Sequence, residues 1–289
     1  YGKTNLLTLT ENNIQSNLED LLKLSIKRQM ISDVPLGAFL SGGIDSSVVV
    51  ALMQSQSNNP IKTFTIGFNE DDYDEAKDAK RIAKHLHTEH TELYISSKEA
   101  LDVIPKLPNI YDEPFSDSSQ IPSFLLSQLT KKNVKVALSG DGGDELFCGY
   151  HRYISTDNWS KKFSSLPIRL RQILAFIIQS ISPNRWNQLI KFLPGLNKNL
   201  NFGHKMHKGA SALEARSLLD VYYILISQLQ NPTDILIKGK ELGTFFTEFR
   251  PELQKLSNHE KMMVLDLLSY LPNDILVKVD RSSMASSLE

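Results

Sequence analysis

The stretch "FLSGGIDSSVVVALM", residues 39–53, decides the fold of this chain. It joins "LGAFL", a short apolar run suited to a buried strand, to "SVVVALMQ", an apolar run typical of a helix. Gly42 and Gly43 lie between the two runs and allow backbone angles that other residues avoid. Because ligands of open parallel sheets bind at the carboxyl ends of strands, we interpret this joint as a ligand-binding loop.

The loop has the composition of a phosphate cradle. Backbone N–H groups at the glycines are not shielded by side chains and can bind an anion, which the positive end of the following helix also attracts. Three serines (Ser41, Ser46 and Ser47) add hydroxyl donors. Asp45 would repel phosphate unless a Mg²⁺ ion lay between them, since magnesium takes oxygen ligands from carboxylates and phosphates together. The simpler alternative is that Asp45 only caps the helix. No lysine follows the glycines, so this is not a Walker loop.

Strand and helix patterns alternate through the first half of the chain. Strands are predicted at 36–40, 61–68, 91–95 and 134–140, and helices at 47–54, 73–86 and 121–132. This alternation predicts an α/β fold with a parallel sheet covered by helices on both faces. Beyond about residue 150 the strand patterns cease, and helices are predicted at 169–181, 211–229 and 259–271. The second half is therefore expected to be mainly helical.

The chain begins with a polar stretch, and we predict a linker over residues 1–14. A helical pattern follows, with five apolar residues on one face that we expect to be buried (Ile14, Leu18, Leu21, Leu22 and Ile26). The first residue is Tyr1 rather than methionine, so we expect a piece cut from a longer protein.

A second constellation, "VALSGDGGDELFCGYHRY", also runs from a strand into glycines and acids. Ser139 and Gly140 are small enough to approach a nucleotide closely, and three carboxylates follow them (Asp141, Asp144 and Glu145). Two acidic loops at the carboxyl ends of parallel strands can share one metal ion. The simpler alternative is that Asp144 and Glu145 are acids at the start of a helix, where the helix dipole favours them. This alternative does not explain the glycines around them.

Composition narrows the class of protein. The chain of 289 residues is 41% hydrophobic and carries a net charge of −1, so it has no overall field that attracts nucleic acid or a membrane. One cysteine, Cys148, cannot form an internal disulfide; we interpret it as a packing residue and expect a reducing, cytoplasmic location. Residues 158–208 hold nine Lys and Arg and no Asp or Glu. This basic segment is a solvated face, a docking surface or a contact for anionic membranes.

Taken together, the motifs carry a family resemblance over nearly the whole chain from about residue 15. The strings are "LSGGIDSS", "FTIGF", "YDEAKDAKRIAKHLHTEH", "DEPFSDSSQIPSFLLS", "LSGDGGDELFCGYHRY" and "LPNDILVKVDRSSMASSLE". As a set they resemble the synthetase domain of glutamine-hydrolysing asparagine synthetases, within the ATP-pyrophosphatase superfamily. The resemblance implies an adenine nucleotide alpha hydrolase-like domain over 15–289, with a nucleotide-binding part (15–150) and a helical part (151–289). An N-terminal glutaminase domain and a C-terminal tail are expected to be absent from the chain.

The resemblance also implies roles for individual residues. Leu40, Ile66, Ser139 and Gly140 would line the adenine and ribose site, and the loop Ser41–Ser47 would bind the leaving pyrophosphate. Asp45 and Asp144 would hold Mg²⁺, and Asp141, often glutamate in the family, would help to form the adenylate. The substrate pocket would be bordered by Asp112, Glu113, Asp117 and Ser118. Lys278 and Arg281 would meet phosphate or carboxylate as catalytic cations, or form internal ion pairs with Asp280 or another acid.

The activity that the resemblance implies is amidation of aspartate. Its β-carboxylate attacks the α-phosphorus of ATP, and ammonia from a glutaminase domain converts the β-aspartyl adenylate to asparagine and AMP. Three alternatives stay open: a related amidotransferase, a β-lactam synthetase-like enzyme that adenylates another carboxylate, and a non-catalytic docking module. ATP and Mg²⁺ are the expected cofactors. We expect no nucleic-acid partner and no membrane contact, and leave self-association open.

Overall fold

The computed structural model describes residues 10–68, 75–190, 202–227, 229 and 251–289. These residues fall into two compact units, which are treated separately below. The α/β unit comprises the described residues up to Phe147 together with Ser269–Glu289, and the helical unit comprises those within Cys148–Leu268. The last twenty-one residues therefore fold with the α/β unit, although the sequence pattern counted them with the helical part.

The α/β unit is built on a four-stranded parallel sheet in the order β3-β2-β1-β4. Its strands are β1 (Leu36–Phe39), β2 (Lys62–Phe68), β3 (Glu89–Ile95) and β4 (Val136–Leu138). In the central strand, Ala38 pairs with Thr63 of β2 on one side and with Leu138 of β4 on the other. The predicted α/β fold with a parallel sheet is confirmed.

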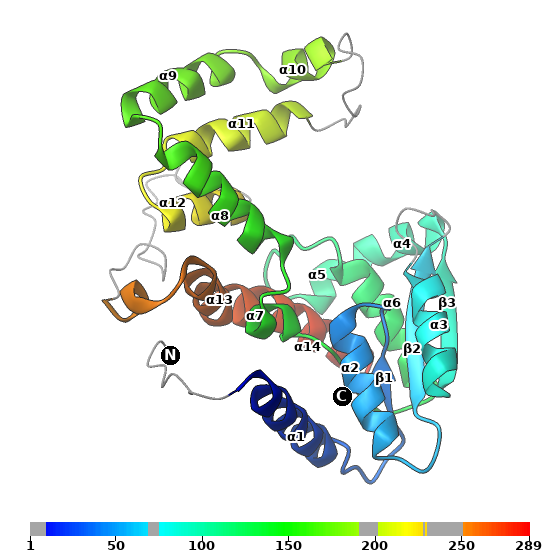
Figure 1. The fold of residues 1–289 in the computed structure, drawn as a ribbon. Coiled ribbons are helices and arrows are strands. Elements are labelled where there is room, and N and C mark those ends of the chain that lie inside the picture. The colour runs from blue at the N-terminus through cyan, green and yellow to red at the C-terminus, as the bar shows by residue number, and fades with distance from the viewer. Residues whose placement is uncertain (1–9, 69–74, 191–201, 228, 230–250) are drawn as a thin grey trace. The chain divides into compact units, whose positions relative to one another are not determined.

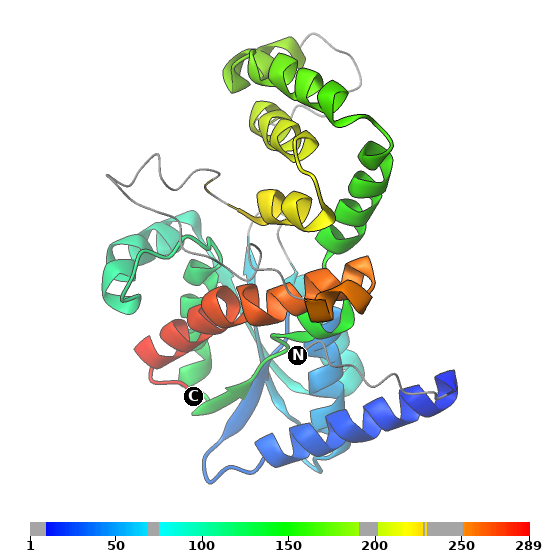
Figure 2. The ribbon, with the colours of Figure 1, turned by 90° about the vertical axis from the view of Figure 1, so that its left-hand side faces the viewer.

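Helices cover both faces of this sheet. Neighbouring residues of β1 point to opposite faces, and apolar side chains on each face pack against helices. Ala38 and Leu40 pack with the helices α1 (Glu11–Gln29), α2 (Ile44–Ser55) and α3 (Ala76–Leu86). Phe39 points the other way, toward a cluster that includes residues of α6 (Gln120–Lys131). Figure 2 shows α2 and α3 on one side of the strands and α14 (Leu276–Ala285, red) on the other.

Helix α1 departs from two expectations. It begins at Glu11, inside the predicted linker. Of the five residues expected to form a buried face only Ile26 is buried, and Leu21 is 65% exposed. Among the described residues, the apolar cluster on this face of the sheet includes only Ile26 of α1 and the adjoining Met30, so it does not extend to the earlier turns.

The short helices of the α/β unit lie at the carboxyl ends of the strands. They are α4 (Ser97–Val103), a 3-10 turn (Ile104–Lys106), α5 (Leu107–Ile110), α7 (Gly143–Phe147) and a π-helical turn (Leu271–Ile275) that leads into α14. The residues after α14 anchor it to the sheet: Leu288 is buried, and the backbone of Glu289 hydrogen-bonds to Lys135 and Ala137 beside β4.

The described part of the helical unit contains no strand, as predicted (Figure 1). Its helices are α8 (His151–Ser164), α9 (Ile168–Gln179), α10 (Pro183–Ile190), α11 (Phe202–Leu213), α12 (Leu218–Ile226) and α13 (Asn258–Leu268), with a 3-10 turn at Pro251–Lys255. The single helix predicted over 211–229 is wrong. Ser217 starts a new helix there through a capping box with Asp220, which interrupts the apolar pattern.

A buried carboxylate joins three helices of this unit. Asp266 of α13 is 0% exposed, and one of its oxygens accepts hydrogen bonds from Arg152 and Tyr153 of α8, both at 2.6 Å, and from Tyr222 of α12 at 2.5 Å. Burial and the neighbouring carboxylate both raise the pKa of Tyr153, so the phenol stays a neutral donor. Breaking such a buried pair by removing one partner costs about 3–5 kcal/mol.

The basic segment 158–208 lies mainly on helices α8 to α11, and its Lys191 and Lys198 fall outside the described residues. Arg171 donates a hydrogen bond of 2.9 Å to the carbonyl of Ala215, whereas Arg169 is exposed. Apolar side chains of α9, such as Phe176 at 72%, are also exposed.

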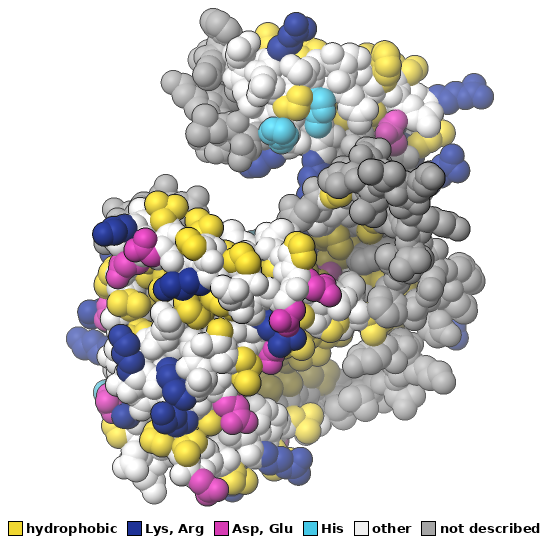
Figure 3. All heavy atoms as spheres, turned by 180° about the vertical axis from the view of Figure 1, so that it is seen from behind, with side chains coloured by type: hydrophobic (Ala, Val, Ile, Leu, Met, Phe, Trp, Pro, Cys, Tyr) yellow, Lys and Arg dark blue, Asp and Glu magenta, His cyan; other side chains and the backbone are white. Residues whose placement is uncertain are grey.

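No helix among the described residues is long and apolar enough to cross a membrane. On the face drawn in Figure 3, hydrophobic, basic and acidic side chains of the α/β unit are interspersed.

Candidate nucleotide-binding site

The loop between β1 and α2 is held by its own serines. The hydroxyls of Ser41 and Ser46 share a hydrogen bond of 3.0 Å, and that of Ser46 also accepts from the backbone N–H of Ser41 at 3.2 Å. Ser47 donates to the carbonyl of Gly43 at 2.6 Å. Gly42 has φ +84°, and a Cβ there would lie 3.0 Å from the backbone nitrogen of Ala79 in α3. The loop needs a glycine at this position for both conformation and space.

Asp45 does not cap helix α2. The N-cap residue is Gly43, which has no side chain to form a capping hydrogen bond. Asp45 lies within that first turn instead. The first N–H groups of a helix need partners from outside the helix, and an anion is a suitable one. This geometry favours the interpretation of the loop as an anion cradle over the capping alternative.

The loop after β4 packs directly against the loop after β1. A Cβ at Gly140 would lie 2.6 Å from the backbone nitrogen of Ser46, and one at Gly143 would overlap the carboxyl group of Asp45. Gly142 has φ +90°, in the left-handed region that favours glycine. The glycines of the second motif therefore bring its backbone into contact with Asp45 and Ser46, which no larger residue would allow.

This contact gathers negative charge. Glu145, in α7, is 1% exposed. Partial burial raises the pKa of Asp45, and the charge of Glu145 raises it further. A divalent cation would relieve that repulsion. Among the described residues no group of three or more His, Cys, Asp or Glu is placed to hold a metal alone. Carboxylate oxygens such as those of Asp45 and Glu145 would suit a Mg²⁺ ion that takes its remaining ligands from phosphate, as magnesium commonly does.

The other predicted nucleotide residues have different exposures. The side chain of Leu40 is 1% exposed in the core, and its N–H donates to the carbonyl of Phe64. Ile66, Ser139 and Asp144 are half-buried, and Asp141 is exposed.

The predicted substrate residues lie in one segment before α6, which we call the 111–119 segment. Asp112, Glu113 and Ser118 are exposed, whereas Asp117 is half-buried. One oxygen of Asp117 accepts hydrogen bonds of 2.8 Å from both the N–H and the hydroxyl of Ser119. The other oxygen lies 3.1 Å from the ammonium of Lys278. Three of the four predicted substrate residues are therefore exposed to solvent, whereas Asp117 is bound by Ser119 and Lys278.

Both predicted cations of α14 form ion pairs. Lys278 contacts Asp117 and donates to the hydroxyl of Ser119 at 2.9 Å. Arg281 lies 3.2 Å from Asp280 and 3.4 Å from Asp112. The internal ion pairs considered from the sequence are therefore present, and a catalytic role for either cation stays a prediction. Burial alone would raise the pKa of Asp117, but the bonds from Ser119 and the charge of Lys278 hold it below its usual range.

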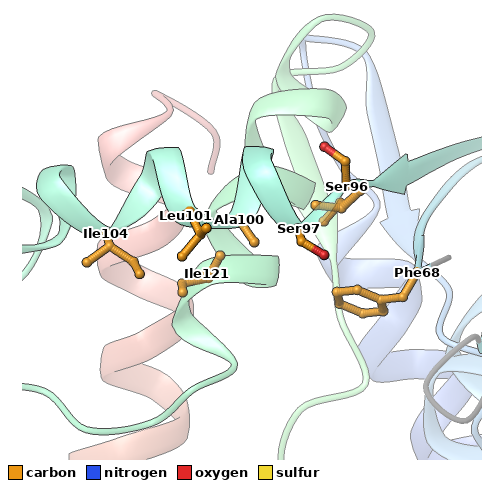
Figure 4. Close-up of a pocket in the computed structure, with 8 residues that line it drawn as sticks. Phe68, Ser96, Ser97, Ala100, Leu101, Ile104 and Ile121 are labelled. Carbon is orange, nitrogen blue, oxygen red and sulfur yellow. The ribbon is translucent and has the colours of Figure 1, made fainter. Parts of the chain in front are cut away.

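Two surface cavities lie in the α/β unit. One, of about 330 Å³, is lined almost wholly by apolar side chains from the ends of β2 and β3 and from α4 and α6 (Figure 4). Its lining is unsuited to a triphosphate. The other, of about 370 Å³, borders Gly42 and contains an ion pair between Arg81 and Asp78 at 3.0 Å.

Cys148 lies at the start of the helical unit with φ +61° and packs with the cluster of Tyr153, Tyr222 and Met262. Burial raises the pKa of its thiol, which makes the reactive thiolate scarcer. These observations agree with a packing role.

The parallel sheet, the glycine-rich loop at its carboxyl edge and the helical second part define an α/β protein of the ATP-pyrophosphatase type. A family model described as asparagine synthase matches residues 17–289. The chain belongs to the asparagine synthase family.

Individual relatives agree with this assignment. The chain is 31% identical over its whole length to an asparagine synthetase (glutamine-hydrolyzing) of Bacillus subtilis, of which it covers 43%. A putative asparagine synthetase of Methanocaldococcus jannaschii is 44% identical over 47% of the chain and 26% of the relative. The human asparagine synthetase is 31% identical over 56% of the chain and 30% of the relative. The chain spans less than half the length of these relatives.

Proposed function

We propose that this chain is the synthetase part of an enzyme that makes asparagine from aspartate, ATP and ammonia through a β-aspartyl adenylate, releasing AMP and pyrophosphate. The observation that carries the proposal is the contact between the two glycine loops. It brings the uncapped start of α2 and the carboxyl groups of Asp45 and Glu145 together at the carboxyl edge of the sheet. Such an edge is where open α/β sheets bind nucleotides.

Each loop contributes a distinct part of the proposed reaction. The N–H groups at the start of α2 bind the β- and γ-phosphates, and the hydroxyls of Ser41, Ser46 and Ser47 would join them after exchanging their hydrogen bonds within the loop. Ser139 and Gly140, with Leu40 and Ile66, hold the adenosine. Asp45 would hold Mg²⁺ together with an acid of α7: the family resemblance implies Asp144, and the buried Glu145 is close enough to Asp45 to raise its pKa. When bound, Mg²⁺ neutralises the negative charge that develops on the leaving pyrophosphate.

The carboxylate acceptor is proposed to bind at the 111–119 segment, where Asp112, Glu113 and Ser118 are exposed. An oxygen of its β-carboxylate forms a bond to the α-phosphorus, and the bond from that phosphorus to the pyrophosphate oxygen breaks. Asp141 is exposed and would assist adenylate formation. Ammonia then attacks the acyl carbon, and AMP leaves with the former carboxylate oxygen.

Ammonia is proposed to come from a glutaminase domain of the native protein. The relatives are described as glutamine-hydrolyzing, and the Bacillus subtilis protein is more than twice as long as this chain. Its additional length is sufficient to contain such a domain.

Oxygen transfer tests the proposal. Native protein is given MgATP, ammonium and aspartate labelled with ¹⁸O in the β-carboxylate, and AMP is analysed by mass spectrometry. One ¹⁸O atom in AMP, with asparagine formed in equal amount, is the expected result. ADP as the product, or AMP without label, would contradict adenylation of the carboxylate.

A related enzyme that adenylates another carboxylate is the second candidate. The observation that favours it is Asp141, one methylene shorter than the glutamate that the resemblance leads us to expect, which changes the reach of this group toward an acceptor. The same labelling experiment with a panel of carboxylates separates the two candidates. A docking module without catalysis would show no magnesium-dependent binding of ATP.

A further inference from the structure

Helix α14 presents three polar side chains to the 111–119 segment. Lys278, Arg281 and Ser282 are three and four residues apart, so they share one face of the helix. Each contacts a different part of the segment: Lys278 holds Asp117 and Ser119, Arg281 lies beside Asp112, and Ser282 shares a hydrogen bond of 2.9 Å with the phenol of Tyr111.

The contacts differ in burial, and burial identifies the principal one. The ion pair between Lys278 and Asp117 has side-chain exposures of 12% and 19%, whereas that between Arg281 and Asp112 has 44% and 78%. Exposed pairs are screened by water and contribute little, so Arg281 contributes little to the position of the segment. Lys278 binds two residues of the segment in surroundings that largely exclude solvent.

Tyr111 fixes the beginning of the segment. Its side chain is 5% exposed, its ring stacks on Phe115 at 4.8 Å between centroids, and its hydroxyl also reaches the backbone carbonyl of Lys278 at 3.4 Å. The segment is therefore attached to α14 near both ends, by Tyr111 and by Asp117 with Ser119. The residues between and beside these anchors that face solvent include Glu113 and Ser118.

We propose that Lys278 is a positioning residue that acts through Asp117 and Ser119, setting where the 111–119 segment meets the carboxylate acceptor. This inference rests on the proposed function, because it takes this segment as the acceptor site. In this arrangement Asp117 is an anchor rather than a ligand: one oxygen is occupied by Ser119 and the other by Lys278. The alternative is that Lys278, whose ammonium has three donors, contacts the substrate directly with the third.

A double-mutant cycle separates the two roles. Lys278→Met, Asp117→Asn and the combined variant are made in the native protein, and KM for the acceptor is compared with the Kd for MgATP. We expect each single change to raise the acceptor KM about tenfold or more, because small displacements of substrate-positioning groups have effects of that size. If Lys278 acts through Asp117, the combined variant is no worse than the single ones, and the Kd for MgATP changes less than about twofold in all three.

Multiplicative effects of the two changes on the acceptor KM would overturn the positioning role, since a direct ligand acts independently of Asp117. An unchanged acceptor KM in Lys278→Met would overturn it as well. Lys278→Arg keeps the charge and is expected to recover part of the lost affinity. Lys80→Met is the matched control, because Lys80 also forms a salt bridge in the α/β unit, at 2.8 Å to Glu92, but does so away from the segment.

Hydrogen–deuterium exchange supplies a readout that does not depend on turnover. Exchange in residues 111–119 is expected to rise in Lys278→Met and to stay at the wild-type level in Lys80→Met. Unchanged exchange in Lys278→Met would show that the lysine does not hold the segment. If the wild-type protein amidates no carboxylate, the proposed function fails, while the exchange measurement still decides whether Lys278 anchors the segment.

Discussion

The glycine loops and the 111–119 segment lie in the same unit but are held in place by different means. In the loops, backbone meets backbone: Gly140 approaches the first turn of α2 so closely that a single methyl group has no room. In the 111–119 segment, side chains provide the attachment, through an ion pair between residues 161 positions apart. The loops are therefore sensitive to added volume, and the segment is sensitive to lost charge.

Added volume at Gly140 should have the largest effect. In Gly140→Ala the new Cβ would lie 2.6 Å from the nitrogen of Ser46 and 2.9 Å from the backbone carbon of Asp45, so one loop must move away from the other. We expect a loss of about 1–3 kcal/mol in the free energy of unfolding and loss of MgATP binding. Denaturant unfolding and calorimetry measure the two quantities.

Gly209→Ala is the matched control for that change. A Cβ at Gly209 would meet its nearest neighbour, Trp159, at 4.0 Å, an ordinary contact, and alanine is the better helix former. This variant should be at least as stable as the wild type. Equal tolerance of alanine at both glycines would show that the two loops are not in close contact.

Lost charge at Asp117 should have an intermediate effect that depends on pH. Because the pKa of Asp117 is held below its usual value of about 3.9, its ionised form stabilises the fold above that pH, and the stabilisation is lost as pH falls through the folded-state pKa. Asp117→Asn should therefore be less stable by about 1–3 kcal/mol at pH 7, and the difference should shrink below about pH 4. Urea unfolding at pH 7 and pH 3.5 tests this; a difference that grows in acid would contradict it.

Lost charge at Asp112 should have the smallest effect on stability. Asp112 is 78% exposed and contacts Arg281 at only 3.4 Å. Asp112→Asn is expected to change the free energy of unfolding by less than about 0.5 kcal/mol. A loss of unfolding free energy as large as that of Asp117→Asn would mean that the exposed and the buried ion pair of the segment contribute equally to stability.

The difference between local backbone conformation and long-range side-chain contact also explains which features the sequence predicts well. Glycines, serines and strand patterns specify conformation over a few neighbouring residues, so the sheet and the loop Ser41–Ser47 were predicted in place. The partner of Lys278 was not, because several acids are equally available to a lysine in the sequence and only the fold selects Asp117. From the sequence, Glu145 is one of the three acids of the second motif but has no predicted metal role, and only its burial beside Asp45 distinguishes it.

Errors in the helices have a similar origin. The apolar face predicted on α1 is real in the sequence, yet Leu21 is exposed, and among the described residues the apolar cluster beside α1 includes only Ile26 of that helix and the adjoining Met30. The break before α12 depends on one capping box at Ser217, a local signal that the longer apolar periodicity concealed.

The central claim is that Asp45 binds magnesium and pyrophosphate, and Asp45→Asn tests it most directly. Burial and Glu145 raise the pKa of Asp45, so at neutral pH its ionised form costs the free protein stability that a cation restores. We predict opposite changes: the variant unfolds at an equal or higher denaturant concentration, but binds Mg²⁺-pyrophosphate about tenfold or more weakly in calorimetry. Asp78→Asn, which removes a carboxylate paired with Arg81 on α3, should bind like the wild type. Equal affinity in Asp45→Asn and the wild type would contradict the account.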